Sequence, residues 1–255
     1  MKSVPKTPSS RLDGRRAVVT GASSGIGFGA AAALAEGGAE VWLVARRAAE
    51  LEEACESIRH VGGRAHSQIL DITDLDATAA FITSVGPIDI LVNSAGLARH
   101  TAALDTTPED YDAAMNLNLR AAFFITREVA RSLIDAKKTG SLINVSSQMG
   151  HVGGPQRAVY CANKHALEGM TKAMALEWAP FGIRVNTLCP TFIRTPWTKD
   201  VLEDPERHAW VLSKIKLGRV GEIEDLMGPI VFLASDASAM VTGTHLIVDG
   251  GWTAE

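Results

Sequence analysis

Two side chains in the segment Tyr160-Cys161-Ala162-Asn163-Lys164 have the chemistry to move a proton. Tyr160 and Lys164 are four residues apart, so a helix over this segment places them on one face. A phenol has a pKa of about 10 in water and is a poor base at neutral pH. A neighbouring ammonium favours the phenolate and lowers that pKa, which would suit Tyr160 to acid–base catalysis. On its own a Tyr-x-x-x-Lys pair is a weak signal, because such pairs arise by chance on helix surfaces.

A hydroxyl group that could assist this chemistry lies in the segment Ile143–Ser147. Ser147 precedes Tyr160 by thirteen residues and stands at the end of a predicted strand. A hydroxyl there can hydrogen-bond a substrate oxygen as negative charge develops on it. Ser146 is a rival, although side chains alternate along a strand and the two serines therefore point apart. Without Tyr160, a role for Ser147 in capping the strand end would carry equal weight.

A glycine-rich stretch over residues 18–27, VVTGASSGIG, joins a predicted strand to a predicted helix with the spacing Gly-x-x-x-Gly-x-Gly. Gly21 would permit the tight turn, while Gly25 and Gly27 would let backbone approach a pyrophosphate. The phosphate oxygens would then meet free N–H groups at the helix start. The alternative is a glycine-rich turn without a ligand. The loop residues expected to contact a dinucleotide are Gly21, Ser23, Ser24, Gly25, Ile26 and Gly27.

The end of the second predicted strand bears on the choice of cofactor. An acidic residue there would accept hydrogen bonds from the ribose 2′-OH of NAD. This strand instead ends on Ala45, and Arg46 follows. A guanidinium can bind the 2′-phosphate of NADP and stack on adenine. The sequence therefore favours NADP over NAD, the alternative being that Arg46 and Arg47 form a solvated helix start.

Two further strand ends could contact the cofactor, because ligands of open α/β sheets bind at the carboxyl ends of parallel strands. After the third predicted strand, Asp71 could accept a hydrogen bond from the adenine amino group, with Ile72 beside it. After the fourth, the small residues Ala95 and Gly96 would let the ribose and nicotinamide lie against backbone. Asn93 is also expected among the cofactor contacts, and it would tie neighbouring strands together.

The segment Pro190–Leu217 is the least regular part of the chain, with three prolines and two tryptophans. An irregular segment at a strand end is a candidate lid over a substrate. Trp197 could line the site, or it could anchor the lid to the core. Gln148 and His151 follow Ser147 closely and are candidate substrate contacts, although a histidine in such a place is often structural.

The seven histidines show no metal-ligand spacing, and the cysteines form no Cys-x-x-Cys pair, so no metal site is expected from the sequence. Cys55, Cys161 and Cys189 are odd in number and suggest no disulfide framework. A reducing cytoplasm is the expected location. The net charge of −4 and a pI near 6.0 give no basic field for nucleic acid or anionic lipid. No apolar run is long enough to span a membrane.

Short apolar runs alternate with longer amphipathic stretches along the whole chain. The alternation predicts βαβ units and hence an α/β fold, a Rossmann-type doubly wound, seven-stranded parallel sheet with helices on both faces. Residues 1–12 are expected to form a flexible N-terminal arm and residues 13–255 a single domain. Longer helices are expected over about Pro108–Lys137, which opens on Thr107 as a helix cap, and Ala158–Phe181. The seven predicted strands are Ala17–Thr20, Val41–Ala45, Ala65–Ile69, Ile88–Val92, Ser141–Val145, Arg184–Leu188 and His245–Val248.

Together these motifs, in this order, resemble the short-chain dehydrogenase/reductase family over essentially Leu12–Trp252. The resemblance implies a catalytic tetrad of Asn118, Ser147, Tyr160 and Lys164. Asn118 rather than Asn116 falls into register with the family's asparagine, and it could position a water in a proton relay. Its alternative role is that of a buried amide satisfied by backbone. The resemblance also implies cofactor contacts from Tyr160, Lys164, Pro190, Thr191, Ile193 and Thr195.

Two positions depart from the family's pattern. Ser94 replaces the second asparagine of an Asn-Asn-Ala-Gly motif, and Thr191 replaces a glycine that follows Pro190. The second change leaves the geometry of the lid hinge in doubt, since backbone there meets the nicotinamide carboxamide in the family. Some carbonyl and sugar reductases of the family share Pro-Thr.

The resulting hypothesis is an oxidoreductase that transfers hydride between NADP(H) and a small carbonyl or alcohol, with Tyr160 as proton donor. A ketone, a sugar or polyol, or a β-ketoacyl chain would each suit the pocket residues. One alternative is an NAD-dependent alcohol or polyol dehydrogenase, and another is a non-catalytic dinucleotide sensor or scaffold. The resemblance also implies a homotetramer that uses the long helices and the C-terminal segment as interfaces.

Overall fold

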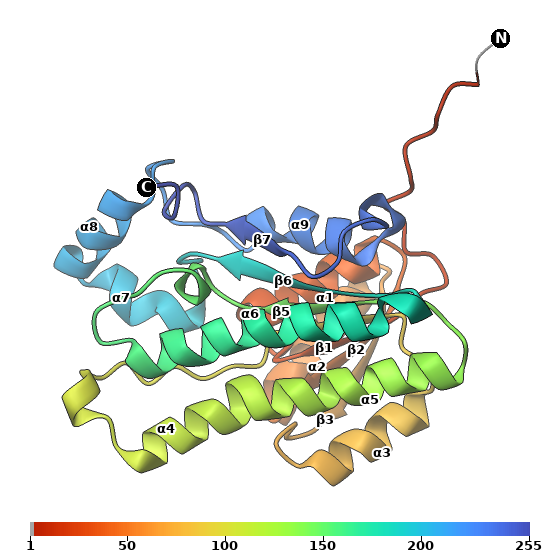
Figure 1. Cartoon of the computed structure of the whole chain (residues 1–255), viewed down its shortest axis with the longest axis horizontal. Coiled ribbons are helices and arrows are strands. Elements are labelled where there is room, and N and C mark those ends of the chain that lie inside the picture. The colour runs from red at the N-terminus through yellow and green to blue at the C-terminus, as the bar shows by residue number, and fades with distance from the viewer. Residues whose placement is uncertain (1–2) are drawn as a thin grey trace.

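The computed structural model describes residues 3–255, which fold around one seven-stranded sheet (Figure 1). All neighbouring strands are parallel, in the order β3-β2-β1-β4-β5-β6-β7. Each predicted strand is present, with ends shifted by two residues or fewer. The strands are β1 (Arg16–Thr20), β2 (Glu40–Ala45), β3 (Arg64–Ile69), β4 (Ile90–Asn93), β5 (Gly140–Val145), β6 (Ile183–Pro190) and β7 (His245–Val248).

Helices cover both faces of the sheet, because its strands carry apolar side chains alternately on either side. Val19 packs into one core with α1, α2 and α9, whereas the adjacent Val18 packs into the other core with α3, α5 and α6. The doubly wound architecture expected from the sequence is therefore confirmed. The helices are α1 (Gly25–Glu36), α2 (Ala48–His60), α3 (Leu75–Val85), α4 (Pro108–Met115), α5 (Ala122–Asp135), α6 (Ala158–Trp178), α7 (Lys199–Glu203), α8 (Pro205–Lys214) and α9 (Glu224–Ala234).

The strand order reverses between β1 and β4, so the chain leaves these two strands toward opposite sides of the sheet. Such a switch point opens a crevice at the carboxyl ends of the strands, where α/β proteins bind ligands. The glycine loop leaves β1 at this point, and Asn93-Ser94-Ala95-Gly96 leaves β4. The topology alone therefore brings two of the sequence motifs to one place.

The first of the two long predicted helices is interrupted by a π turn. Thr107 caps its start by accepting a hydrogen bond from the Asp110 N–H, as expected, and Pro108 occupies the first turn. Residues Asn116–Ala121 then widen into π geometry between α4 and α5. Single π turns inside helices occur frequently at functional sites.

The segment after β6 is more regular than expected, because it contains the helices α7 and α8. Its prolines begin helices rather than break them. Pro205 takes the first position of α8, and the Asp204 carboxylate caps that helix by accepting from two backbone N–H groups, those of Glu206 and Arg207. Trp210 anchors α8 against Trp252, so that tryptophan serves the packing of the lid.

Residues 3–11 are exposed and belong to no helix or strand, and buried packing begins at Leu12 against the α1 end at Gly37. Arg11 forms an ion pair with Asp13 beside this junction. Among residues 3–255, no helix is both long and apolar enough to cross a membrane.

Candidate active site

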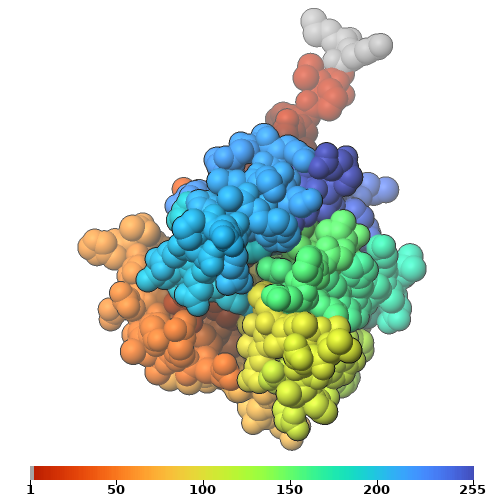
Figure 2. All heavy atoms as spheres, turned by 90° about the vertical axis from the view of Figure 1, so that its left-hand side faces the viewer, coloured from red at the N-terminus to blue at the C-terminus, as the bar shows by residue number. Residues whose placement is uncertain are grey.

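One pocket lies at the carboxyl ends of the central strands, beneath α7 and the segment that joins it to β6. Figure 2 looks onto this end of the molecule, where α7 and α8 project beside the hollow. The glycine loop, the ends of β2 to β6, and the start of α6 all contribute side chains to the pocket wall. The motifs found separately in the sequence therefore converge here.

The glycine loop is built from direct contacts between backbone segments. Gly21 and Gly25 have φ angles of +67° and +57°, which L side chains rarely adopt. A Cβ at Gly27 would lie 2.3 Å from the Gly21 carbonyl oxygen, and a Cβ at Gly21 would lie 2.8 Å from the Ala95 backbone. No acidic residue occupies the first turn of α1, so its free N–H groups face the pocket without a competing negative charge.

Two arginines flank the end of β2. Arg46 lines the pocket and lies 3.5 Å from the Asp71 carboxylate, with 70% of its side chain exposed. Arg47 donates hydrogen bonds to the hydroxyls of Ser23 (3.1 Å) and Ser24 (3.2 Å), so it also closes on the glycine loop. The sequence predicts only Arg46 as a cofactor contact, whereas in the structure Arg47 also lines the pocket and contacts the glycine loop.

The β3 and β4 ends differ in what they offer to a ligand. Asp71, Ile72, Ala95 and Gly96 line the pocket. Asn93 does not line it, because its amide is buried and donates to the Thr126 hydroxyl (2.8 Å) and the Asn144 side chain (3.0 Å). Asn93 therefore ties β4 to β5 and α5, as predicted. Its side chain lies outside the pocket wall, and its predicted contact with the cofactor stays a prediction.

Ser147 and Tyr160 meet at the centre of the pocket. The Ser147 hydroxyl donates to the Gln148 side-chain oxygen (2.8 Å) and accepts from the Met149 N–H (3.1 Å). Burial raises the pKa of the Tyr160 phenol, against the lowering effects of its hydrogen bond with Ser147 and of the Arg157 charge. The sequence predicts that Lys164 lowers this pKa, but the effect of burial is larger and the pKa is raised. A phenol that stays protonated at neutral pH can act as a proton donor.

Lys164 is buried behind Tyr160, one helical turn along α6. Its ammonium donates to the Val145 carbonyl (2.9 Å) and lies 5.6 Å from the centre of the Tyr160 ring. Burial lowers the pKa of Lys164 from 10.5 to about 8. The β5 end thus fixes the ammonium next to the phenol, within the pocket wall.

Asn118 lies on the π turn and faces the pocket. Its amide oxygen accepts from the Leu97 N–H (2.7 Å), and its amide nitrogen donates to the Leu97 carbonyl (2.6 Å). The amide is therefore satisfied by backbone, the alternative considered for it, and it braces the loop after Gly96. Asn116 points elsewhere and accepts from Arg120.

The substrate end of the pocket contains Gln148 and Trp197, as expected, but not His151. His151 instead lies outside the pocket wall, near Glu168 and His245. The pocket histidine is His100, whose ring meets Tyr160 edge to face at 5.7 Å between centroids. Burial lowers the pKa of His100 to about 4, with smaller effects of the Arg157 and Arg207 charges. The one sequence feature that could have identified His100 as a pocket residue is its position in the loop that follows β4.

The last wall of the pocket is the segment after β6. Pro190, Thr191, Ile193 and Thr195 all line it. The Thr191 N–H donates to the Val248 carbonyl (3.2 Å), which fixes the hinge that the sequence left in doubt. The Thr191 hydroxyl oxygen is buried without a hydrogen-bond partner. A buried unpaired hydroxyl and a glycine-lined cradle fit a polar ligand such as a dinucleotide.

Known proteins resemble this chain over almost its whole length. A family model described as enoyl-(acyl carrier protein) reductase matches residues 21–253. The L-xylulose reductase of Bos taurus is 41% identical over 96% of this chain and 98% of its own length. The gluconate 5-dehydrogenase of Gluconobacter oxydans is 39% identical over 95% of this chain and 96% of its own. A gluconate 5-dehydrogenase from Burkholderia cenocepacia, solved with NADP and tartrate, matches with a TM-score of 0.92 and 36% identity over 96% of this chain and 98% of that one.

Proposed function

The chain belongs to the short-chain dehydrogenase/reductase family, and from that premise we propose that it interconverts a keto sugar acid and the corresponding alcohol with NADP(H). As a member it is an NAD(P)-dependent oxidoreductase that acts on carbonyl or alcohol groups. The choice of substrate and the preference for NADP are proposals, and each is supported by particular side chains of the pocket.

Tyr160 is the proposed proton donor in the reductive direction. The bound nicotinamide would supply hydride to the carbonyl carbon. Tyr160 would give its proton to the carbonyl oxygen, and its raised pKa keeps that proton available at neutral pH. The Ser147 hydroxyl would hold the same oxygen as negative charge develops there. The buried Lys164 ammonium would limit the charge that accumulates on the phenol after transfer.

Asn118 would hold part of the pocket wall in place rather than take part in proton transfer. Its two bonds to Leu97 hold the loop that follows β4 against the π turn. That loop carries Gly96 and, farther along, His100, both of which line the pocket. We assign Asn118 the role of a positioning residue for this wall.

The preference for NADP is supported by the arginines at the β2 end. No acidic residue stands at the last position of β2 to accept from a ribose 2′-OH, since that position is Ala45. Arg46 and Arg47 both line the pocket, and Arg47 lies against the serines of the glycine loop. A phosphate placed here would meet two guanidinium groups, which favour it through charge-assisted hydrogen bonds.

The proposal of an acidic substrate is supported by another arginine of the pocket, Arg157, which lies apart from the two arginines after β2. Arg157 lines the pocket beside Tyr160, and its guanidinium stacks over Phe192 and Trp210. The charges that influence its pKa are those of Arg207, Tyr160 and Cys161, and none of them is a carboxylate. Within residues 3–255 the Arg157 guanidinium donates to the Pro155 carbonyl (3.0 Å) and forms no ion pair with an acidic side chain. A partly buried guanidinium in this state favours a ligand that carries a carboxylate. This observation carries the choice of a keto sugar acid over a neutral ketose.

A substrate panel tests the proposal directly. NADPH oxidation would be followed with 5-keto-D-gluconate, L-xylulose, D-erythrulose and a neutral cyclic ketone, each also with NADH. We expect the highest kcat/KM for the keto acid with NADPH. Arg157→Gln should lower kcat/KM for the acid by about tenfold or more, since a hydrogen-bonded charge contributes about 1.5–3 kcal/mol, and should leave the neutral ketoses almost unchanged. Equal loss for acid and neutral substrates would contradict the acidic-substrate proposal.

We also propose a homotetramer, supported by apolar residues exposed on the long helices. Met115, Leu119, Phe123 and Phe124 line a surface groove along α4, the π turn and α5. Leu176 on α6 is 80% exposed. Such surfaces are more often interfaces than free faces. Sedimentation of the wild-type chain and of Phe123→Asp tests this, with a smaller species expected for the variant. A monomeric wild type would contradict it.

A cytoplasmic location is part of the same proposal. Cys55, Cys161 and Cys189 are all free thiols in the structure. Free buried thiols suit a reducing compartment. Fractionation of the source cells, with the protein followed by antibody, is expected to recover it with cytoplasmic markers, and recovery with an oxidising compartment would contradict the assignment.

A further inference from the structure

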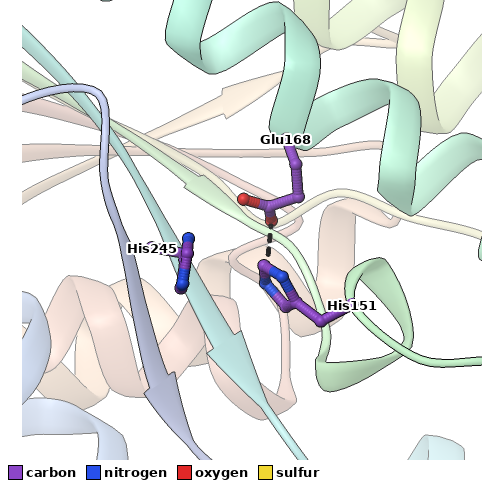
Figure 3. A group of neighbouring side chains, drawn as sticks. All are labelled: His151, Glu168 and His245. Atoms are coloured by element: carbon purple, nitrogen blue, oxygen red, sulfur yellow. Dashed lines mark ion pairs between the residues drawn. The ribbon is translucent and has the colours of Figure 1, made fainter.

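Three potential metal ligands meet beside β6 and β7, outside the pocket wall. His151 follows the short turn after Ser147, Glu168 lies on α6, and His245 begins β7 (Figure 3). One ligand atom of each lies within 4.8 Å of the other two. The sequence conceals this group because its members are separated by 17 and 77 residues.

Glu168 is a buried carboxylate, with 8% of its side chain exposed. It accepts hydrogen bonds from the Thr187 hydroxyl (2.8 Å) and the Cys189 thiol (3.3 Å), so its orientation is fixed. The ion pair recorded for it is with His151, at 3.8 Å, and this exists only when the imidazole is protonated. The buried Lys164 ammonium, one turn earlier on α6, interacts electrostatically with this carboxylate. A metal ion would add a direct bond to the carboxylate oxygens.

The two histidines are suited to be ligands. The His151 imidazole is largely buried, with 20% of its side chain exposed, and its Nε2 atom lies 3.8 Å from the Glu168 carboxylate. The rings of His151 and His245 lie 4.4 Å apart between centroids, and the Glu168 carboxylate lies close to both (Figure 3). His245 is exposed, so an ion could enter from solvent.

We propose that His151, Glu168 and His245 form a zinc site, with water in the fourth position. Two imidazoles and one carboxylate are a donor set that Zn²⁺ accepts, whereas Mg²⁺ and Ca²⁺ prefer oxygen ligands alone. The Cys189 thiol donates a hydrogen bond to the Glu168 carboxylate (3.3 Å) and would hold that carboxylate in place behind the ion. Such donors behind a ligand are a regular feature of metal sites.

A bound ion would join the turn after β5, the helix α6 and the strand β7, and the first two of these segments carry pocket residues. His151 is four residues after Ser147, and Glu168 is one helical turn after Lys164. His245 pairs in register with Thr187 on β6, three residues before Pro190. The ion would therefore stabilise the scaffold of the pocket without touching the reacting atoms.

Metal-binding measurements on the intact, chelator-treated protein test the proposal. We expect titration with Zn²⁺ alone to give saturable binding of one ion per chain and a higher unfolding temperature, and we expect Mg²⁺ to give neither. Absence of saturable Zn²⁺ binding, or equal binding of Mg²⁺, would overturn the site.

Variants at an exposed and a buried ligand identify the residues involved. His245→Asn changes an exposed side chain, so the variant should fold, and we expect its Zn²⁺ affinity to fall at least about tenfold. Glu168→Gln should show the same loss. His66→Asn is the matched control, because His66 is also an exposed histidine on a strand beside a glutamate, Glu40 (2.9 Å). Loss of binding in the control, or retention in His245→Asn, would assign the ion to the protein surface.

Cys189→Ser separates a hydrogen-bond donor from a ligand. A serine hydroxyl can still donate to Glu168, so Zn²⁺ affinity should stay within about threefold of the wild type. A loss as large as that of His245→Asn would replace the proposed ligand set with one that contains the thiolate.

Discussion

At the turn between β1 and α1, the pocket wall consists of backbone packed on backbone, whereas at the Trp197 end of the same pocket it consists of side chains. A Cβ at Gly27 would lie 2.3 Å from a carbonyl oxygen of the loop, a distance that leaves no room for any side chain. Trp197 is 54% exposed, and Gly96 opposite it leaves ordinary contact distances. The cofactor end is therefore set by the fold, while the substrate end can change without disturbing the fold.

The largest effect is expected at the backbone end, from Gly27→Ala. The added methyl would push the loop apart, cost about 1–3 kcal/mol of stability and abolish NADPH binding. Fluorescence titration with NADPH and thermal unfolding measure both effects. Gly228→Ala is the matched control, since Gly228 lies in α9 with open space at its Cβ, and it should bind NADPH normally. Normal binding by Gly27→Ala would contradict the account of this end.

Lys164 should give the protein a pH-dependent stability. Its folded pKa of about 8 lies below its unfolded value of 10.5, so both states hold the proton below about pH 8 and burial of the charge is then destabilising. Above that pH the folded state releases the proton first, and stability rises. From about pH 8 to about pH 9.5 the wild type should gain roughly 2 kcal/mol relative to Lys164→Met. Denaturant unfolding at several pH values measures this, and parallel curves for the two proteins would contradict it.

Thr191 tests whether the unpaired hydroxyl of the lid hinge serves the cofactor. Thr191→Val keeps the shape of the side chain and removes only the hydroxyl. NADPH affinity should fall about three- to tenfold, as expected for one hydrogen bond, while the free protein should be as stable or more stable. Unchanged affinity would mean that this hydroxyl contacts neither NADPH nor anything that positions it.

The smallest effect is expected from Trp197→Ala at the side-chain end. The exposed ring should contribute little to folding, so the unfolding temperature should hardly change. The KM for the accepted substrate should rise a few-fold, because the ring lines the pocket, while NADPH affinity stays the same. A loss of stability comparable to that of Gly27→Ala would show that the two ends do not differ as described.

Much of the fold could be predicted because its signals are local. The run Val41–Ala45 is apolar throughout, and Ser141–Val145 is apolar except for Ser141 and Asn144, as suits strands buried on both faces. The glycine spacing and the Tyr160–Lys164 pair are local as well. The segment Pro190–Leu217 was harder to predict, because a proline can either end a helix or begin one. Pro205 begins α8 here because Asp204 before it caps the helix.

The side-chain environment of the pocket could not be predicted in the same way. His151 is near Ser147 in sequence, yet the turn after the strand places it beside Glu168 and outside the pocket wall. His100 and Arg157 lie in loops whose paths depend on how the sheet and helices pack. Asn118 hydrogen-bonds Leu97 because it lies on the π turn, which the sequence does not predict. Partners brought together by tertiary packing leave no periodic signal in one sequence.

The central claim is that Tyr160 delivers the proton in a pocket that also holds NADPH, and single-turnover reduction by Tyr160→Phe tests it most directly. The account predicts a rate of hydride transfer about 10²–10⁴-fold below that of the wild type, with NADPH affinity unchanged. An unchanged rate with every accepted substrate would contradict it.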